Sequence, residues 1–491
     1  MIRSATITGI LLIILSLSET AAQNNQVLYH MDLPQNHLLN PALRPGNSVY
    51  AGLPAITGLK LNVNNNFFNF SDVFIAGNQP SDSIISFLHP DYDVDRFLAK
   101  VNDRNYLEPQ AAIQLLGLGF SAGRDMYIFM DLITRVEGNF VLPGDLLRLG
   151  LKGNEQFVGR SIDLSSFRAD IRAYNELGLG FSRDITNRLR IGVKGKLLFG
   201  IATGSVNNKS LGIKVNEDYS HTLDADMTLN ISGPVTVYTS QDNKIDSIRL
   251  DEERFDSSGN VIGFLTTMKN AGLGIDLGAE YRITGRLTLS ASVTDLGYIR
   301  WKSDITNLRA ESRFEFSGLN MLDVFNGTKT FEELGEETLD SLKNSLYVTD
   351  TRKPFTTYLS AGFSAGGKYN LTRSFSLGLL SYTRITGRHI REALTLSANL
   401  NLGNALSTTV SYTASNNRYD NLGAGVAFRA GIFQFYCIAD RIPVIWNKIV
   451  IDNGSFHLPD SWNTIHAKLG MNLVFGSFVK KKQDKPMILV E

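Results

Sequence analysis

The sequence predicts an all-β protein: a transmembrane antiparallel β-barrel of 14 to 16 strands, with short helices in its extracellular loops and an N-terminal plug segment. Three observations lead to this fold class. The chain begins like an exported protein, long stretches alternate apolar with polar residues, and tight turns alternate with long loops. The 48 basic and 48 acidic side chains balance, so charge indicates no nucleic-acid partner.

Cysteine and histidine usage argues against metal and cofactor chemistry. Cys437 is the single cysteine, which excludes a disulfide framework. The seven histidines show no spacing typical of a zinc site. We therefore expect no metal and no cofactor.

Residues 1–22 are predicted to be a signal peptide. Arg3 precedes an apolar run over residues 7–17, and small residues surround Ala22 at the expected cleavage site. A membrane-anchoring helix is the alternative, but the run is shorter than the ~20 residues that span a bilayer. We expect an exported mature chain that begins at Gln23.

Residues 23–55 are expected to be a plug or hatch. The turn at Asn40, Pro41 and Ala42, followed by Pro45, prevents a helix or an interior strand. A barrel of 14 to 16 strands encloses a lumen too wide for its own side chains to fill. The segment is therefore predicted to fold back into the lumen, with a disordered periplasmic leader as the alternative.

Residues 56–478 carry the alternating pattern that predicts the barrel. From 394 to 402, leucine and alanine alternate with threonine, serine and asparagine, which gives one apolar and one polar face. Strands of about ten to fourteen residues are long for a β-sandwich and suit a bilayer, where the apolar face contacts lipid. The sixteen expected strands are 59–70, 108–122, 126–140, 168–183, 188–201, 221–231, 235–249, 265–283, 286–301, 356–370, 374–385, 390–402, 405–416, 421–430, 432–442 and 463–476. Fourteen strands is the alternative, because 59–70 and 235–249 are weakly patterned.

Four similar links predict tight hairpin turns. They read ITNR at 185–188, ITGR at 283–286, LTRS at 371–374 and ITGR at 385–388. Counting strand directions places the first three at the periplasmic end and the fourth at the outer rim. Long outer loops are then expected at 71–107, 141–167, 202–220, 302–355 and 443–462, and residues 479–491 form a charged C-terminal tail.

Two of these loops are predicted to contain helices. Thr330 and Glu333 have capping-box spacing, and Val94, Phe97 and Leu98 recur at helical intervals. The helices would serve as lids or a docking surface, or would pack the loops together.

The polar faces carry more basic than acidic residues. An electropositive lumen would favour anionic solutes, although basic residues at the rims could meet lipopolysaccharide instead. The side chains expected to face the lumen are Arg190, Lys194, Lys196, Arg282, Lys368, Arg384, Arg429 and Lys468, against Asp276 and Glu280.

Asp295 breaks the alternation of its strand. A simple strand would turn this carboxylate toward lipid, at a cost of about 2 kcal/mol or more near the midplane. A bulge at Thr294 and Asp295 would bring Asp295 into the lumen and turn Leu296 and Tyr298 outward. We assign Trp301 to the interfacial aromatic belt, with a ligand contact as the alternative.

The sequence GFSAG occurs at 119–123 and at 362–366, which raises the question of a serine nucleophile. A nucleophile elbow requires a strand, a sharp turn and then a helix, and neither copy has this context. We therefore expect Ser121 and Ser364 to be structural and the protein not to be an enzyme.

Three stretches carry a family resemblance: NHLLNPALRPGNSVYAGLPAI at the front, YNELGLGFSRDITNRLRIGVKGKLLFG in the middle, and ASVTDLGYIRW at 291–301. Through them the chain resembles an uncharacterised outer-membrane barrel family of the Bacteroidota. The turn at residues 40–42 more distantly resembles that of long-chain fatty-acid transporters and of the type IX secretion barrel, in which an N-terminal segment enters the barrel. The missing glycine-rich lead and the charged tail depart from those relatives.

Two functions follow as expectations for the cell outer membrane. A passive transporter would carry small hydrophobic or amphipathic molecules, including anionic ones if the lumen is electropositive, and would bind a lipid-like ligand. A non-transporting scaffold would bind a secretion-system or surface protein through its loops. Both would contact outer-membrane lipid.

Overall fold

The computed structural model describes residues 26–75, 85–86, 89, 92–240, 245–316, 328–330, 333, 348–386, 389–403, 405–415, 418–443, 446–451, 454–459 and 463–476. The predicted signal peptide and the charged tail lie outside these ranges. Within them, no helix is long and apolar enough to cross a membrane.

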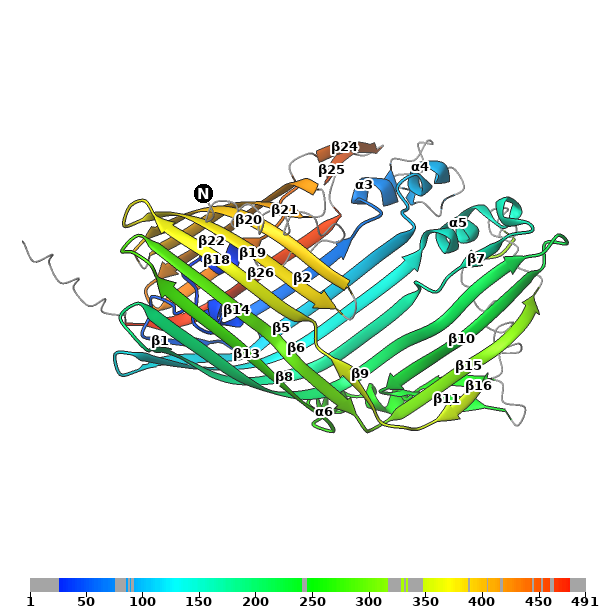
Figure 1. The fold of residues 1–491 in the computed structure, drawn as a ribbon, viewed down its shortest axis with the longest axis horizontal. Coiled ribbons are helices and arrows are strands. Elements are labelled where there is room, and N and C mark those ends of the chain that lie inside the picture. Colours follow the sequence, from blue (N-terminus) through cyan, green and yellow to red (C-terminus); the bar gives the residue numbers. More distant parts are fainter. Residues whose placement is uncertain are drawn as a thin grey trace, which may run out of the picture.

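The described strands form a closed, antiparallel barrel of 14 strand positions (Figure 1). Strand β26 pairs with both β1 and β2, and this pairing closes the barrel. In order, the positions are β1 (Val49–Gly52) with β2 (Gly58–Asn65), β5 (Arg104–Ala122), β6 (Met126–Pro143), β8 (Arg168–Asp184), β9 (Leu189–Val215), β10 (His221–Ser232) with β13 (Asn270–Arg282), β14 (Leu287–Trp301) with β15 (Ile305–Phe316), β16 (Val348–Thr351) with β17 (Phe355–Tyr358) and β18 (Ala361–Asn370), β19 (Phe375–Thr386), β20 (His389–Leu402), β21 (Leu406–Ser415), β22 (Arg418–Ala430), β23 (Phe433–Ala439) and β26 (Thr464–Phe475).

The strand list with sixteen members is wrong, and fourteen is correct. The stretch 235–249 does not span the wall, because β11 (Val235–Thr239) and β12 (Ile245–Leu250) form a separate two-stranded sheet. Strands β10 and β13 then share one position, since both pair with β9. The alternation of 235–249 reflects a small hairpin outside the barrel.

Three of the four similar links share one turn chemistry. The hydroxyls of Thr186, Thr284 and Thr372 each accept hydrogen bonds from two backbone N–H groups, two and three residues further along the chain. These turns lie at one end of the barrel, which we call the short-turn end; the other is the long-loop end. The fourth link follows β19 at the long-loop end, as predicted, and its residues 387–388 lie outside the described part.

The two faces of the wall differ as the alternation predicts. Large apolar side chains on the outer face are exposed, among them Leu179 at 61%, Leu396 at 56% and Val410 at 56%. Polar side chains on the opposite face are buried, including Thr395 and Asn399. An exposed apolar belt around a closed sheet is the arrangement of a membrane-spanning barrel, because all backbone groups pair within the sheet while leucines meet acyl chains.

The predicted bulge in β14 is present. The register of β13 and β14 shifts between Ile275 and Leu277, and Asp295 adopts a φ of 59°. Leu296 and Tyr298 turn outward, each 41% exposed. The bulge reverses the facing of every later residue of β14, so Trp301 points inward and is fully buried. The assignment of Trp301 to an interfacial belt was therefore wrong.

Several expected loops continue as strands. Strand β9 runs to Val215, and β10 and β15 pair beyond the level at which the other strands end. Figure 1 shows this sheet, with β16, protruding from the long-loop end. The predicted loops 202–220 and 302–355 are thus partly sheet. Their strands were missed because residues 202–212 and 305–316 lack the regular alternation of leucine with polar residues that marks the lipid-facing strands.

Helices cover part of the long-loop end. α4 (Val94–Leu98) forms where the spacing predicts it, with the Asp93 side chain accepting a hydrogen bond from the Asp95 N–H. Phe97 and Leu98 are buried in a cluster against which Leu147 and Leu151 of α5 (Gly144–Lys152) pack, and this second helix was not predicted from the sequence. At the second loop, the Thr330 and Glu333 side chains and N–H groups bond reciprocally as in a capping box, while the helix predicted beyond lies outside the described residues.

Candidate functional site

Residues 26–47 run inside the barrel at the short-turn end, where Figure 1 shows them in dark blue. They form α2 (Gln26–His30), the 3₁₀ helix η1 (Pro34–Leu38) and an irregular stretch that leads to β1. We call residues 26–47 the inner segment. Its side chains are largely buried. The segment therefore fills lumen space that the wall side chains alone would leave open.

The first half of the inner segment contacts the wall through both apolar and polar groups. Val27, Leu28, Met31 and Leu33 form a buried cluster with Ala427, Tyr436 and Ile438 of β22 and β23. The polar contacts hold the backbone and side chains in register with the wall. The Val27 N–H donates to Asp440, and Gln35 and Asn472 exchange hydrogen bonds of 2.7 and 3.1 Å.

The turn at Asn40, Pro41 and Ala42 lies against β13 and β14. The Asn40 side chain accepts a hydrogen bond from the Ala42 N–H (2.9 Å), and its amide donates to the Ala291 carbonyl (3.3 Å). The Ser292 hydroxyl donates to the Leu39 carbonyl (2.7 Å). The asparagine thus closes the turn and attaches it to the wall, which a purely apolar residue could not do.

Two wall glycines make room for this turn. A Cβ on Gly278 would lie 2.0 Å from the Asn40 Oδ1, and a Cβ on Gly192 would lie 2.1 Å from the Pro41 carbonyl carbon. The second contact is with backbone, which cannot move aside as a flexible side chain can. The inner segment and the strands are therefore matched in shape at this point.

The end of the inner segment is fixed at the short-turn rim. Arg44 donates to the Ser182 hydroxyl (2.8 Å) and forms an ion pair with Asp184 (3.2 Å). The Gly46 N–H donates to Asp32 (2.7 Å), and this hydrogen bond joins the two halves of the segment. Pro45, which lies between Arg44 and Gly46, is buried.

A buried network of charges lies where the inner segment meets β6, β8 and β9. His37 Nε2 is 2.7 Å from Asp131, and Lys194 Nζ lies 3.2 Å from Asp131 and 2.8 Å from Glu176. Gln114 donates to the other Asp131 oxygen (2.7 Å). Asp131 therefore connects the inner segment to the wall.

The same network continues to the bulge. Lys196 Nζ lies 2.7 Å from Asp276 and 2.6 Å from Asp295, and Arg135 pairs with Glu176 at 2.8 Å. The bulge turns Asp295 toward Lys196 and lets its N–H donate to Asp276 (2.7 Å). Removing one member of such a buried network costs about 3–5 kcal/mol, because its partners are left as uncompensated buried charges.

Four of the other residues expected to face the lumen, Arg190, Arg282, Lys368 and Arg429, lie nearer the short-turn rim, where Arg429 donates to the Val474 carbonyl (3.1 Å). Arg384 lies 3.8 Å from Glu137 further along the barrel, and Lys468 is buried near the middle of β26. Arg190 pairs with Asp184 (2.7 Å) and with Glu280 (3.3 Å). Arg282 is half exposed beside Glu280, and Lys368 is partly buried next to His30.

The excess of inward cations among the described residues is smaller than the sequence count indicated, because acids that the count omitted also point inward. Asp131, Glu137 and Glu176 also point inward and pair with lysine and arginine side chains. The count of charged residues on the polar faces missed these three acids, because it did not include β6 and β8. In β6, residues 131, 135 and 137 share the parity of buried Tyr127 and Phe129, so alternation could have found them.

The two GFSAG serines make structural hydrogen bonds. Ser121 donates to the Ser48 carbonyl (3.0 Å) at the start of β1. Ser364 lies 2.6 Å from the Ser292 hydroxyl, behind the turn at Asn40. Each lies within a strand rather than at a strand-to-helix turn, so the geometry of a nucleophile elbow is not formed.

The chain belongs to the family of unknown function DUF5723, whose model matches residues 41–440. A comparison with curated proteins gives no match. Among solved structures, the chain is similar to the toluene transporter TbuX of Ralstonia pickettii, with 9% identity, a TM-score of 0.42 and coverage of 94% of this chain and 100% of the other. A FadL homologue of Pseudomonas aeruginosa follows, with 10% identity, a TM-score of 0.41 and coverage of 91% and 95%.

Proposed function

We propose that this DUF5723 chain is an outer-membrane transporter through which small hydrophobic or amphipathic molecules pass, and that the inner segment is its plug. The observation that carries the proposal is the way the lumen is filled. The lumen is filled by the inner segment, which precedes the first strand in the sequence. Hydrogen bonds, ion pairs and apolar contacts hold this segment, and these contacts can break and re-form without unfolding any strand.

An apolar hollow in the wall beside the plug supports a hydrophobic solute. A hollow of about 470 Å³ lies on the outer face, lined mainly by Leu277, Ala279, Ala291, Val293, Phe363 and Ala365. Gly278 and Ser292, which also border the hollow, contact the turn at Asn40 from the lumen side. In the proposal, a hydrophobic solute meets the wall at this hollow and leaves through the lumen or sideways between strands. The sideways route requires β14 to separate from β13 or β18, with which it is paired here. Arg135, Arg172, Lys194 and Lys196 are each paired with inward acids, so these four cations do not by themselves give the lumen a preference for anions.

The plug can be tested by tethering it. In a Cys437→Ser background, Gln35→Cys and Asn472→Cys would replace two side chains that now bond to each other. Oxidation should lower the uptake of toluene and of a long-chain fatty acid into vesicles with a lipopolysaccharide outer leaflet, and reduction should restore it. The matched control is Gln35→Cys alone, which oxidation should leave unchanged. Equal uptake with the tether open and closed would contradict the plug.

A non-transporting scaffold is the second candidate, and one observation favours it. Strands β9, β10 and β15 extend beyond the barrel and carry their own buried cluster, which includes Ile213, Val215 and Leu223. An extended sheet with its own hydrophobic core is a surface to which a secreted or surface protein can bind. Absence of uptake by both the tethered and the untethered protein would favour this scaffold over the transporter.

A further inference from the structure

A long insertion leaves the barrel wall between β10 and β13. Ser232 at the end of β10 pairs with Thr203 of β9, and Asn270 at the start of β13 pairs with Gly200. Residues 233–269 thus depart and return at nearly the same level of the wall. Their described part contains β11, β12 and the helix α6 (Ser258–Leu265). Figure 1 shows α6 along the outside of the barrel.

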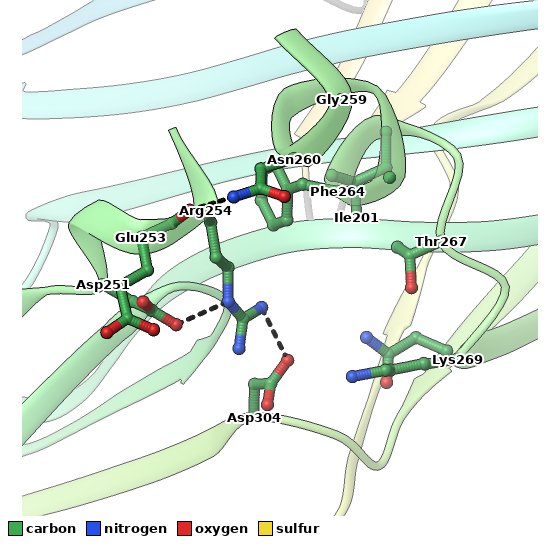
Figure 2. Close-up of a pocket in the computed structure, with 12 residues that line it drawn as sticks. Ile201, Asp251, Glu253, Arg254, Gly259, Asn260, Phe264, Thr267, Lys269 and Asp304 are labelled. Carbon is green, nitrogen blue, oxygen red and sulfur yellow. Dashed lines mark hydrogen bonds and ion pairs between the residues drawn. The ribbon is translucent and has the colours of Figure 1, made fainter. Parts of the chain in front are cut away.

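The insertion is fixed to the wall by polar contacts. The Gly233 N–H donates to the Asp304 carbonyl (3.0 Å), and Arg254 bridges Asp251 (2.7 Å) and Asp304 (3.0 Å). Figure 2 shows this bridge beside Lys269 and Asn260, in a cavity of about 450 Å³ between the insertion and the wall. The hydrogen bonds of Arg254 raise its pKa and lower that of Asp304, so both groups stay charged near neutral pH.

A second contact places α6 against the outer face of β8. The Asn175 amide donates to the Leu265 carbonyl (2.6 Å). Tyr174 and Glu176, the neighbours of Asn175 in the strand, are buried in the lumen network, so Asn175 itself points outward. Helix α6 therefore lies on the side of the wall that bears the apolar belt.

Helix α6 and the residues just after it expose apolar side chains that nothing in the described structure covers. Ile262 and Leu265 of α6 are 60% and 44% exposed, and Met268, three residues past the end of the helix, is 71% exposed. The Ser257 hydroxyl caps the helix by accepting from the Asn260 N–H (3.2 Å), which defines where the helix begins. These side chains would be unfavourable in water, and they lie next to a surface already adapted to lipid.

Apolar side chains of the belt lie close to the point where the insertion leaves the wall. Leu273, three residues after Asn270 where β13 begins, pairs with Leu197 of β9 and with Tyr298 of β14. All three side chains are exposed on the outer face. Further toward the long-loop end the outer face of β8 carries both Asn175 and the exposed Ile171, and the insertion carries Arg254 and Lys269. The helix thus lies between apolar side chains of the wall and charged side chains of the insertion, an arrangement typical of amphipathic helices at a membrane surface.

We propose that α6 and the residues just after it form a membrane-surface anchor that inserts Ile262, Leu265 and Met268 into the lipid leaflet at the long-loop end. Its partner is the lipid itself, at the border between headgroups and acyl chains. The inference depends on the barrel spanning the membrane and does not depend on transport.

Spin labels can measure the depth of α6 in the full chain reconstituted into phospholipid vesicles. Single cysteines at Ile262 and Met268, in the Cys437→Ser background, should give labels that oxygen reaches and a water-soluble nickel complex does not. The reference for lipid is a label at Leu273 in the belt, and the reference for water is a label at Asp256 in the same insertion. We expect the ratio of oxygen to nickel accessibility at 262 and 268 to match that at 273 within about twofold.

Two results would overturn the anchor. Labels at 262 and 268 with the nickel accessibility of the Asp256 label would show that α6 faces water. Labels shielded from both reagents would show that protein, such as a second copy of the chain, covers the helix. Uptake measurements on the same labelled variants keep the anchor separate from the transport proposal, because either can fail without the other.

Discussion

Asp131 of the wall binds both the inner segment and neighbouring strands. Its carboxylate meets His37 of the segment, Lys194 of β9 and Gln114 of β5. A carboxylate with three buried partners cannot be removed without leaving charge and donors uncompensated.

Asp131→Asn should therefore weaken the docking of the inner segment by about 3 kcal/mol. The expected result is faster proteolysis within residues 26–47 of the reconstituted protein, with the barrel itself intact. Glu217→Gln in the exposed turn between β9 and β10 is the charge-matched control. Equal cleavage of both variants would contradict the role of Asp131.

Two glycines of β9 give a steric test of the same contact. A Cβ on Gly192 would collide with the Pro41 backbone, whereas a Cβ on Gly195 would meet nothing closer than 4.0 Å. Gly192→Ala should displace the inner segment and raise solute uptake, and Gly195→Ala should not. If the two variants behave alike, the turn at residues 40–42 does not sit on β9 as described.

His30 makes the docking dependent on pH. Burial, with Lys368 adding to it, lowers the pKa of His30 to about 3. The undocked imidazole, with its ordinary pKa near 6.5, binds a proton more readily, so docking is fully favoured above about pH 6.5 and weakens as pH falls below it. At pH 5 the loss is about 2 kcal/mol, since one pKa unit equals about 1.4 kcal/mol.

The prediction is that proteolysis of the inner segment increases from pH 7.5 to pH 5, and that His30→Asn reduces this increase. A variant that retains the full pH dependence would assign it to other groups.

At the scale of elements, alternation and turn chemistry predicted most of the barrel. The strand alternation, the turns at Thr186, Thr284 and Thr372, and the bulge at Asp295 all follow from local rules. The prediction that Trp301 faces the membrane interface was wrong, because the bulge at Asp295 also reverses the side on which residue 301 lies. A one-residue shift reverses every later side chain.

The candidate site was only partly predictable. The turn at Asn40 could be recognised from its prolines, but its contacts with Gly278 and Ser292 join residues more than two hundred positions apart. Likewise, no local pattern pairs His37 with Asp131. Which side chains meet across a lumen depends on barrel closure and register, and these are not local properties of a sequence.

At the scale of the whole molecule, an apolar belt encloses a polar interior that is itself occupied by the chain's own N-terminal region. The belt requires a bilayer, and the occupied interior requires that any passage move the inner segment or go around it. The central claim is therefore that residues 26–47 close the barrel.

Single-channel conductance in planar bilayers tests this claim most directly. The mature protein should show little steady conductance, whereas a variant lacking residues 26–47 should open a stable pore with a conductance at least several-fold larger. Equal conductance of the two proteins, with both barrels folded and inserted, would contradict the account.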